Sequence, residues 1–202
     1  MPAFDSAPST LALVALAAYL LGSVPFGIVV ARVFGLGDLR AIGSGNIGAT
    51  NVLRTGNKLA AFLTLVLDAG KGAIAVLIAR AAVGEDAAQI AGFFAFLGHI
   101  YPIYLRFRGG KGVATFLGTL LALSFFGGLA ACLTWLVVAI LFRISSLSAL
   151  ICAATAPVWL WLLGHGEMTV LAALLGALVW LRHAANIRRI VNGTEPRIGK
   201  KG

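Results

Sequence analysis

The distribution of apolar residues constrains the fold of this chain more than any other feature. A helix needs about 20 predominantly apolar residues to cross the hydrocarbon core of a bilayer. Seven apolar runs approach or reach that length, at roughly residues 9–32, 57–82, 87–105, 112–127, 128–143, 147–163 and 168–190. The runs are continuously apolar and do not alternate with polar residues, so they predict membrane-spanning helices and not a membrane barrel.

The composition supports this interpretation. Of the 202 residues, 60% are hydrophobic and 11% are charged, whereas a soluble domain is about 45–50% apolar and about 25% charged. No internal repeat or long linker is visible, so we expect residues 1–202 to form a single integral membrane domain. Met1–Thr10 contains an acid but no Lys or Arg, which predicts a first spanning helix and not a cleaved signal. Cys132 and Cys152 lie in apolar runs without ligand spacing, which predicts core packing.

The charges predict an orientation. Basic residues follow the first, third, fifth and seventh runs, whereas acids lie near the alternate ends, where Arg80 is the one basic residue. Because basic residues in short loops stay in the cytoplasm, we expect an all-α polytopic membrane protein with seven transmembrane helices, its N-terminus outside and its C-terminus cytoplasmic. The boundary at Phe126-Gly127-Gly128 is weak, so five or six spans remain an alternative. The net charge of +9 then reflects cytoplasmic loops and not nucleic-acid binding.

The stretch IGSGNIGATNVLRTGNK, residues 42–58, is a candidate anion site. Glycines let backbone N–H groups point into a concavity, and the stretch adds hydroxyl, amide and basic side chains before the second apolar run, where helix N-termini also favour anions. The alternative is a turn whose polar residues only cap helices. The candidate ligands are Gly43, Ser44, Gly45, Asn46, Gly48, Thr50, Asn51 and Arg54.

The stretch GHIYPIYLRFRGGKG, residues 98–112, is a second candidate. Its residues of interest are His99, Gly109, Gly110 and Lys111, the last supplying a point charge for phosphate. It is not a nucleotide-binding P-loop, because Gly112 follows the lysine where that motif needs Ser or Thr. A basic cytoplasmic loop without function would explain the arginines of this stretch but not its glycines.

Two further polar groups interrupt apolar runs. Near the C-terminus, RHAANIRRIVNGTEPRIG (182–199) places His183, Asn186 and Arg189 at spacings that share a helix face, and polar residues in membrane helices usually face the bundle interior. In DAGKG (68–72), Asp68 and Lys71 are three residues apart and can pair. That pair is either a buried structural ion pair or lies directly beneath an anion pocket.

Several classes of site are disfavoured by what the sequence lacks. The acids on the predicted cytoplasmic side are few and scattered, which disfavours a magnesium cluster. No His is followed five residues later by Asp, and no GxSxG nucleophile elbow occurs. A transporter or channel for an organic phosphate would need polar residues through the full membrane depth, and a purely structural membrane protein would leave the glycine loops unexplained.

Five motifs together resemble the PlsY family of bacterial membrane glycerol-3-phosphate acyltransferases, which use acyl phosphate as donor. They are SVPFG (23–27), GSGNIGATN (43–51), DAGKG (68–72), GHIYPIYLRFRGGKG (98–112) and HAANIRRIVNGTEPRIG (183–199). The resemblance implies a seven-helix inner-membrane protein with these motifs on the cytoplasmic side. It implies transfer of an acyl group to the 1-hydroxyl of glycerol 3-phosphate, giving lysophosphatidic acid and phosphate in the first acylation step of phospholipid biosynthesis. No covalent acyl-enzyme, metal or cofactor is expected.

The resemblance also implies roles and partners. Ser44 would lie near the reacting centre, and His183 and Asn186 would position the substrate hydroxyl. Either His183 or the phosphate of the substrate could take its proton. SVPFG would end or kink the first helix. The expected partners are acyl phosphate, glycerol 3-phosphate, membrane lipid and an acyl-phosphate-producing enzyme, with no nucleic acid. The substrate-binding residues implied are Gly43, Gly45, Asn46, Gly48, Thr50, Asn51, Arg54, Asp68, Lys71, His99, Gly109, Gly110, Lys111 and Arg189.

Overall fold

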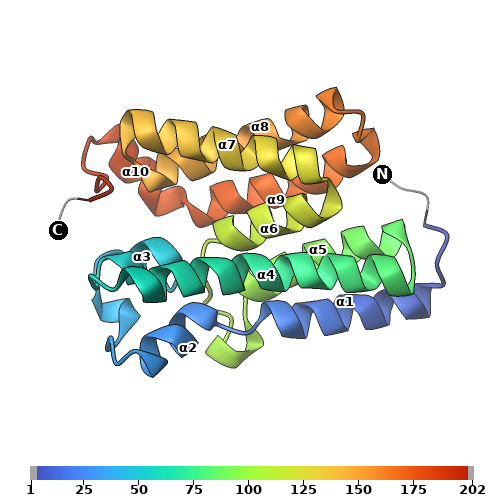
Figure 1. Ribbon diagram of the computed structural model, residues 1–202, viewed down its shortest axis with the longest axis horizontal. Coiled ribbons are helices and arrows are strands. Elements are labelled where there is room, and N and C mark those ends of the chain that lie inside the picture. The colour runs from blue at the N-terminus through green and yellow to red at the C-terminus, as the bar shows by residue number, and fades with distance from the viewer. Residues whose placement is uncertain (1–3, 200–202) are drawn as a thin grey trace. The chain divides into compact units, whose positions relative to one another are not determined.

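The computed structural model describes residues 4–199, and this part of the chain contains helices and no strands (Figure 1). The α-helices are α1 Pro8–Gly22, α2 Phe26–Val33, α3 Ala49–Leu53, α4 Lys58–Ala82, α5 Glu85–Ile100, α6 Val113–Leu123, α7 Phe125–Phe142, α8 Ser145–Leu162, α9 Thr169–Arg182 and α10 Ala184–Val191. Three single-turn 3₁₀ helices lie at Leu39–Ala41, Ile103–Leu105 and Gly166–Met168. The all-helical prediction is confirmed for these residues.

The chain forms two compact units, and it passes from the first to the second within α6, between Thr119 and Leu120. The first unit contains α1 to α5 and the beginning of α6. The second contains the last turn of α6 and the helices α7 to α10. The candidate loops before α3 and before α6 therefore belong to the first unit, whereas the C-terminal motif belongs to the second.

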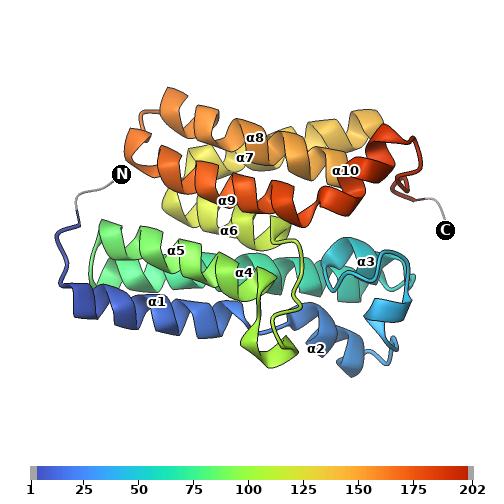
Figure 2. The ribbon, with the colours of Figure 1, turned by 180° about the vertical axis from the view of Figure 1, so that it is seen from behind.

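In the first unit, α1, α4 and α5 run side by side (Figure 2). Their contact surface is made of small residues, with Ala18, Ala91 and Ala95 buried in one cluster. At Gly22 the approach is so close that a Cβ atom would lie 2.0 Å from the carbonyl oxygen of Ala95. Small residues let helix backbones approach closely in a membrane, where apolar burial alone does not drive association.

The predicted break at SVPFG is confirmed, because α1 ends at Gly22 and α2 begins at Phe26. Pro25 lacks the N–H group that a continuous helix would need at this point. The two helices together make an apolar stretch of 26 residues, Pro8–Val33. At the start of α2, a Cβ atom on Gly27 would lie 1.7 Å from the carbonyl oxygen of Ile47, so α2 packs directly against the polar loop that follows it.

In the second unit, α8 packs between α7 and α9. The Sγ of Cys152 in α8 donates to the carbonyl of Ala131 in α7 at 3.2 Å, and the indole of Trp180 in α9 donates to Leu150 in α8 at 3.1 Å. Cys132 and Cys152 are both free, and Cys152 is fully buried. The burial and contact of Cys152 agree with the prediction that it serves packing, whereas the packing role of Cys132, which is half-buried, stays a prediction.

Five stretches of the described chain are long and apolar enough to cross a membrane, and a sixth is added if α9 and α10, which are bent by 64°, count as one broken span. The run at 112–127 contains the 11-residue helix α6 and the first residues of α7, and α6 alone is shorter than a membrane span. Its boundary with the next helix lies at Ser124 and not at residues 126–128, because the Ser124 hydroxyl accepts from Gly127 N at 3.2 Å and caps α7. The expected continuous helix over 168–190 is also wrong, because it breaks at His183.

Candidate functional site

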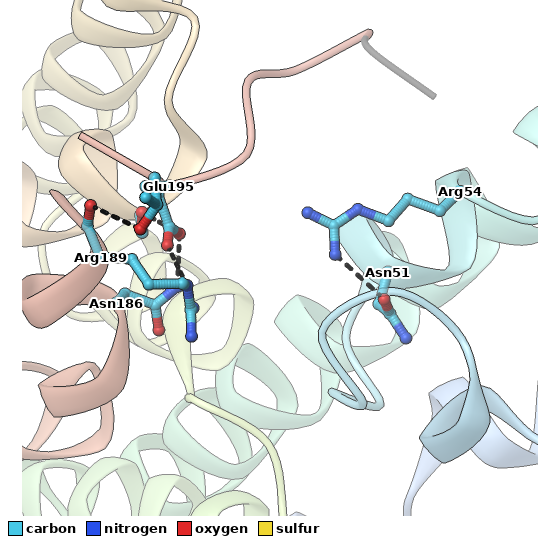
Figure 3. A network of polar contacts seen from close by, with 7 residues as sticks. Asn51, Arg54, Asn186, Arg189 and Glu195 are labelled. Atoms are coloured by element: carbon cyan, nitrogen blue, oxygen red, sulfur yellow. Dashed lines mark hydrogen bonds and ion pairs between the residues drawn. The ribbon is translucent and has the colours of Figure 1, made fainter. Parts of the chain in front are cut away.

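The loop between α2 and α4 folds around the side chain of Asn51, which is 1% exposed. Its Oδ1 atom accepts hydrogen bonds from the backbone N and the hydroxyl of Ser44, at 3.1 and 3.3 Å. The same oxygen accepts from the Arg54 guanidinium at 3.3 Å (Figure 3). The Asn51 amide nitrogen in turn donates to the carbonyl of Leu39 at 2.9 Å. One buried amide thus holds a hydroxyl and a guanidinium together, and both Ser44 and Arg54 are exposed on the surface of the loop.

The other candidates in this loop lie around that centre. The short helix α3, which we had not expected, begins after Gly48 and carries the exposed Thr50. Asn46 accepts a hydrogen bond from its neighbour Ile47 N at 3.0 Å. At the start of α4, Asn57 Oδ1 accepts from Ala60 N at 2.9 Å. Because this cap occupies the Ala60 N–H group, that group is not available to the anion that we expected at the start of this helix.

Gly43 is required by the geometry of the loop. Its φ is +52°, and a Cβ atom there would lie 2.7 Å from both Asn51 Oδ1 and Arg54 Cδ. We therefore expect Gly43→Ala to displace the guanidinium and to lower the activity of the protein by about tenfold, the effect of losing one well-placed charged contact. Initial rates of the purified variant in lipid measure the loss.

Gly56 provides the matched control for that variant. Its φ is also positive, at +89°, but nothing lies within 4 Å of a Cβ atom placed on it. Gly56→Ala carries backbone strain of about 1–2 kcal/mol and no steric clash with the site. Equal activity losses in the two variants would show that strain alone, and not displacement of Arg54, causes the effect.

The second glycine loop lies in the same unit and contacts the first. Arg40 donates from Nη2 to the carbonyl of Arg108 at 2.7 Å and so joins the two loops. The chain before the glycines turns through two left-handed residues, Arg106 and Phe107, with φ of 52° and 63°. Such conformations are costly for side-chain-bearing residues and recur at functional loops. Lys111, half-buried, follows Gly110 in this loop.

Asp68, Lys71 and His99 form a buried cluster. Lys71 Nζ lies 3.0 Å from Asp68 Oδ1, which confirms that the two residues pair. His99 Nδ1 lies 3.5 Å from the same carboxylate oxygen. The three side chains are 1–4% exposed, so their surroundings are protein and not solvent. Their expected contact with substrate stays a prediction.

In the second unit, the break between α9 and α10 places His183 and Asn186 in the interior, at 2% and 4% exposure. His183 Nδ1 lies 2.7 Å from the carbonyl oxygen of Val179. Because a carbonyl only accepts, the proton of this bond is on Nδ1, and in the neutral ring Nε2 then carries the lone pair. This tautomer suits a proton acceptor.

Glu195 binds the C-terminal segment back onto the helices, a role that we had not assigned to it. Its Oε1 accepts from Ser146 Oγ at 2.6 Å and from Asn186 Nδ2 at 2.5 Å, and its Oε2 accepts from Arg189 Nε at 2.6 Å (Figure 3). Burial opposes ionisation, but these three hydrogen bonds and the Arg189 charge lower the pKa of Glu195 below its ordinary value. The carboxylate therefore orients the Asn186 amide and compensates Arg189.

The glycine two residues before Glu195 is the weak signal for this contact in the sequence. In the structure, Gly193, with φ of 68°, reverses the chain, and Thr194 N donates to Arg189 O at 2.8 Å. The turn thereby brings an acid at position 195 next to a base six residues earlier.

In residues 4–199, no group of three or more His, Cys, Asp and Glu side chains is arranged to hold a metal ion. Ser44, Asn51 and Arg54 are brought together in one unit, and His183, Asn186 and Arg189 in the other.

A family sequence model described as glycerol-3-phosphate acyltransferase matches residues 12–193. The chain belongs to this family. A glycerol-3-phosphate acyltransferase of Cereibacter sphaeroides is 68% identical over 201 residues, covering 100% of this chain and 96% of that protein. One of Jannaschia sp. is 65% identical over 200 residues, covering 99% of this chain and 98% of that protein.

The fold of the glycerol-3-phosphate acyltransferase family is also known from crystal structures. The glycerol 3-phosphate form of PlsY, an integral membrane glycerol 3-phosphate acyltransferase, matches with a TM-score of 0.88 and 40% identity over 94% of this chain and 96% of that chain. The lysophosphatidic acid form matches with a TM-score of 0.85 and 37% identity over 94% of this chain and 95% of that chain. The predicted resemblance to PlsY is thus confirmed, and this chain is an integral membrane protein of that family.

Proposed function

We propose that this protein transfers an acyl group from acyl phosphate to the 1-hydroxyl of glycerol 3-phosphate, giving lysophosphatidic acid and phosphate. The observation that carries the proposal is the Asn51-centred loop, which presents a hydroxyl and a guanidinium together and is joined to the glycine loop of Lys111. Both substrates bring a phosphate, and two basic, glycine-containing loops can hold two anions. The membrane accommodates the acyl chain. PlsY has been crystallised with glycerol 3-phosphate and in a lysophosphatidic acid form, which supports this pair of substrate and product.

The proposed chemistry is a single displacement. The 1-hydroxyl oxygen of glycerol 3-phosphate attacks the carbonyl carbon of the acyl phosphate, and the bond from that carbon to the bridging oxygen breaks. Phosphate leaves with the electron pair, while Arg54 and Lys111 stabilise its charge. The hydroxyl proton passes to His183 Nε2, in the tautomer that Val179 favours, or to the phosphate of the substrate. Because phosphate is already an activated leaving group, the step needs neither a covalent acyl-enzyme nor a metal.

The proposed substrate contacts follow the roles that the family resemblance implies for individual residues. Ser44 lies near the reacting carbonyl, and His183 and Asn186 position the hydroxyl. The remaining proposed contacts to phosphate and donor are Gly43, Gly45, Asn46, Gly48, Thr50, Asn51, Arg54, Gly109, Gly110, Lys111 and Arg189. Arg189 is already paired with Glu195, so its contribution to substrate binding would be as part of that ion pair.

We also propose the membrane arrangement. The basic loops follow alternate apolar runs, which supports seven spans in one domain, with the N-terminus outside and the active site on the cytoplasmic side of the bacterial inner membrane. There the protein would perform the first acylation of phospholipid biosynthesis and receive its donor from an acyl-phosphate-producing enzyme. Cysteine-reactive labelling of single cysteines placed in the loops at 42–58 and 84–85 tests the orientation.

The proposal is tested with purified protein in lipid, palmitoyl phosphate and glycerol 3-phosphate, in the presence of a chelator. Phosphate release is expected only when both substrates are present. Without the acceptor, a rapid-quench measurement is expected to show no burst of phosphate, since no acyl-enzyme forms. A burst equal to the enzyme concentration would replace the single displacement with a two-step mechanism, and release that requires a divalent ion would contradict the metal-free step.

A further inference from the structure

The buried cluster of Asp68, Lys71 and His99 has no role in the chemistry described above. An ionic pair within a membrane-spanning helix is costly unless each charge is compensated. Here the carboxylate of Asp68 lies 3.0 Å from the Lys71 ammonium and 3.5 Å from the His99 ring. The packing of α4 on α5 could be achieved with apolar residues alone. A cluster so deeply buried points to a function in fixing geometry.

The glycine loop, Gly109–Gly112, packs directly on His99. The Gly110 backbone N donates to His99 O at 3.2 Å. A Cβ atom on Gly110 would lie 2.3 Å from His99 Nε2, and one on Gly109 would lie 2.2 Å from His99 O. The loop therefore approaches the His99 backbone at Gly109 and the His99 imidazole at Gly110 too closely for a side chain at either position. The orientation of the ring thereby limits where the next residue, Lys111, can lie.

The cluster holds the other side of the same loop as well. Thr115, in the first turn of α6, donates from Oγ1 to the carbonyl of Asp68 at 2.8 Å. The residues flanking Lys111 are thus attached to the Asp68 turn of α4 and to the His99 turn of α5. Asp68 and His99 are themselves paired, so the two attachments are coupled.

Lys71 extends the cluster to the first polar loop. Its Nζ donates to the carbonyl of Val24 at 2.8 Å and lies 5.7 Å from the centre of the Phe26 ring. These residues form the break that begins α2, and Gly27 of α2 packs against Ile47 of the Asn51-centred loop. One buried ionic cluster therefore contacts the supports of both basic loops.

We propose that Asp68, Lys71 and His99 are positioning residues, which hold the Gly109–Gly112 loop so that Lys111 can bind a substrate phosphate. In this proposal they act through the loop, in place of the direct substrate contact that the family resemblance implied, because their side chains are only 1–4% exposed. This inference rests on the proposed function, since it deepens the role of Lys111 in that site. Directional hydrogen bonds and ionic contacts fix one geometry of a loop more sharply than apolar packing, which tolerates small shifts.

The first test is steady-state kinetics in lipid with each substrate varied in turn. Lys111→Ala identifies which substrate depends on the loop. His99→Ala is expected to raise the KM for that same substrate by about tenfold with kcat changed by less than about threefold, as for lost ground-state positioning of a contact. His99→Asn should recover most of this loss, because its Nδ2 can take the place of the ring Nδ1 that faces Asp68.

The control for these variants is Thr64→Val on the same helix. Thr64 is fully buried one turn before Asp68, and its hydroxyl donates to Ala60 O at 2.8 Å within the helix. We expect both KM values to stay at the wild-type level. If His99→Ala and His99→Asn both abolished kcat and left KM unchanged, His99 would have a chemical role and the proposal would be overturned. Unchanged KM values in His99→Ala would also overturn it.

A second measurement does not depend on turnover. Amide hydrogen exchange of residues 109–112 is expected to be faster in His99→Ala than in the wild type, and unchanged in Thr64→Val. Unaltered exchange in His99→Ala would contradict the positioning role even if the enzyme is active. Conversely, if the wild type showed no acyl-transfer activity while His99→Ala still exchanged faster than the wild type and Thr64→Val did not, only the proposed function would be contradicted.

Discussion

Asn51→Leu is expected to abolish about 99% or more of the acyl-transfer activity while the helical content of the protein is retained. Leucine has the same branched arrangement of side-chain heavy atoms as asparagine but accepts no hydrogen bond, so the Ser44 and Arg54 donors lose their common partner. A hydrogen bond from a charged group contributes about 1.5–3 kcal/mol, and one between neutral groups about 0.5–1.5 kcal/mol. Losing the Arg54 bond and both Ser44 bonds together therefore costs about 2.5–6 kcal/mol, and a hundredfold change in population corresponds to roughly 2.7 kcal/mol. Rates in lipid and circular dichroism measure the two properties.

The control is the same substitution at Asn57. That side chain accepts a single backbone hydrogen bond, from Ala60 N at 2.9 Å, as the cap of α4. Asn57→Leu should lower stability by about 1 kcal/mol, as for other caps, and leave activity within about threefold of the wild type. If both variants lost activity equally, the loss would come from unfolding of the region and not from the Asn51 hydrogen bonds.

Glu195→Gln is expected to lower activity by about tenfold to a hundredfold, because it disconnects the C-terminal segment from α10. Glutamine preserves the size of the side chain but replaces one acceptor oxygen by a donor. That donor must face either Asn186 Nδ2 or Arg189 Nε, both of which are donors already. Losing one charge-assisted hydrogen bond costs about 1.5–3 kcal/mol. Thermal unfolding and initial rates of the variant check both consequences.

The pH dependence of stability gives this prediction a second readout. The pKa of Glu195 is lowered in the folded protein relative to its ordinary value of 4.5. Its ionised form therefore stabilises the fold fully at pH values above 4.5, and this contribution is lost as the pH falls through the lowered pKa. The difference in unfolding temperature between wild type and Glu195→Gln should be constant near neutral pH and shrink below 4.5.

Glu167→Gln is the matched control for this pH experiment. Glu167 is 41% exposed and its carboxylate lies 3.6 Å from the His165 ring, and exposed contacts of this kind contribute little. The activity of the Glu167→Gln variant and its unfolding temperature near neutral pH should match those of the wild type. A difference between wild type and Glu195→Gln that stayed the same down to pH 3 would contradict the role assigned to the Glu195 charge.

The sequence was sufficient for the class of fold, because apolar runs of membrane-spanning length have few alternatives in a bilayer. It also predicted the break at SVPFG and the pairing of Asp68 with Lys71, which rest on local properties of proline and of helix spacing. It did not predict the break at His183 or the cap at Ser124. Both depend on tertiary contacts and on caps that a run of apolar residues conceals.

The candidate site shows the same division. The glycine-rich loops could be selected as anion sites from residue types alone. Asn46 and Asn51 could not be distinguished, because both are amides in one loop and only the folded chain shows that Asn51 accepts from Ser44 and Arg54. Glu195 was counted only as a scattered acid, since its three partners come from α8 and α10. Long-range hydrogen bonds of this kind leave no periodic signal in a sequence.

The most direct test of the account is the fate of the bridging oxygen of acyl phosphate. Palmitoyl phosphate carrying ¹⁸O at the bridging position is supplied with glycerol 3-phosphate to the purified protein in lipid, and both products are analysed by mass spectrometry. We predict one lysophosphatidic acid for each phosphate released, with the label in the phosphate, because the carbonyl carbon–oxygen bond breaks. Failure to form lysophosphatidic acid, or retention of the label by the acyl group, would contradict acyl transfer from acyl phosphate.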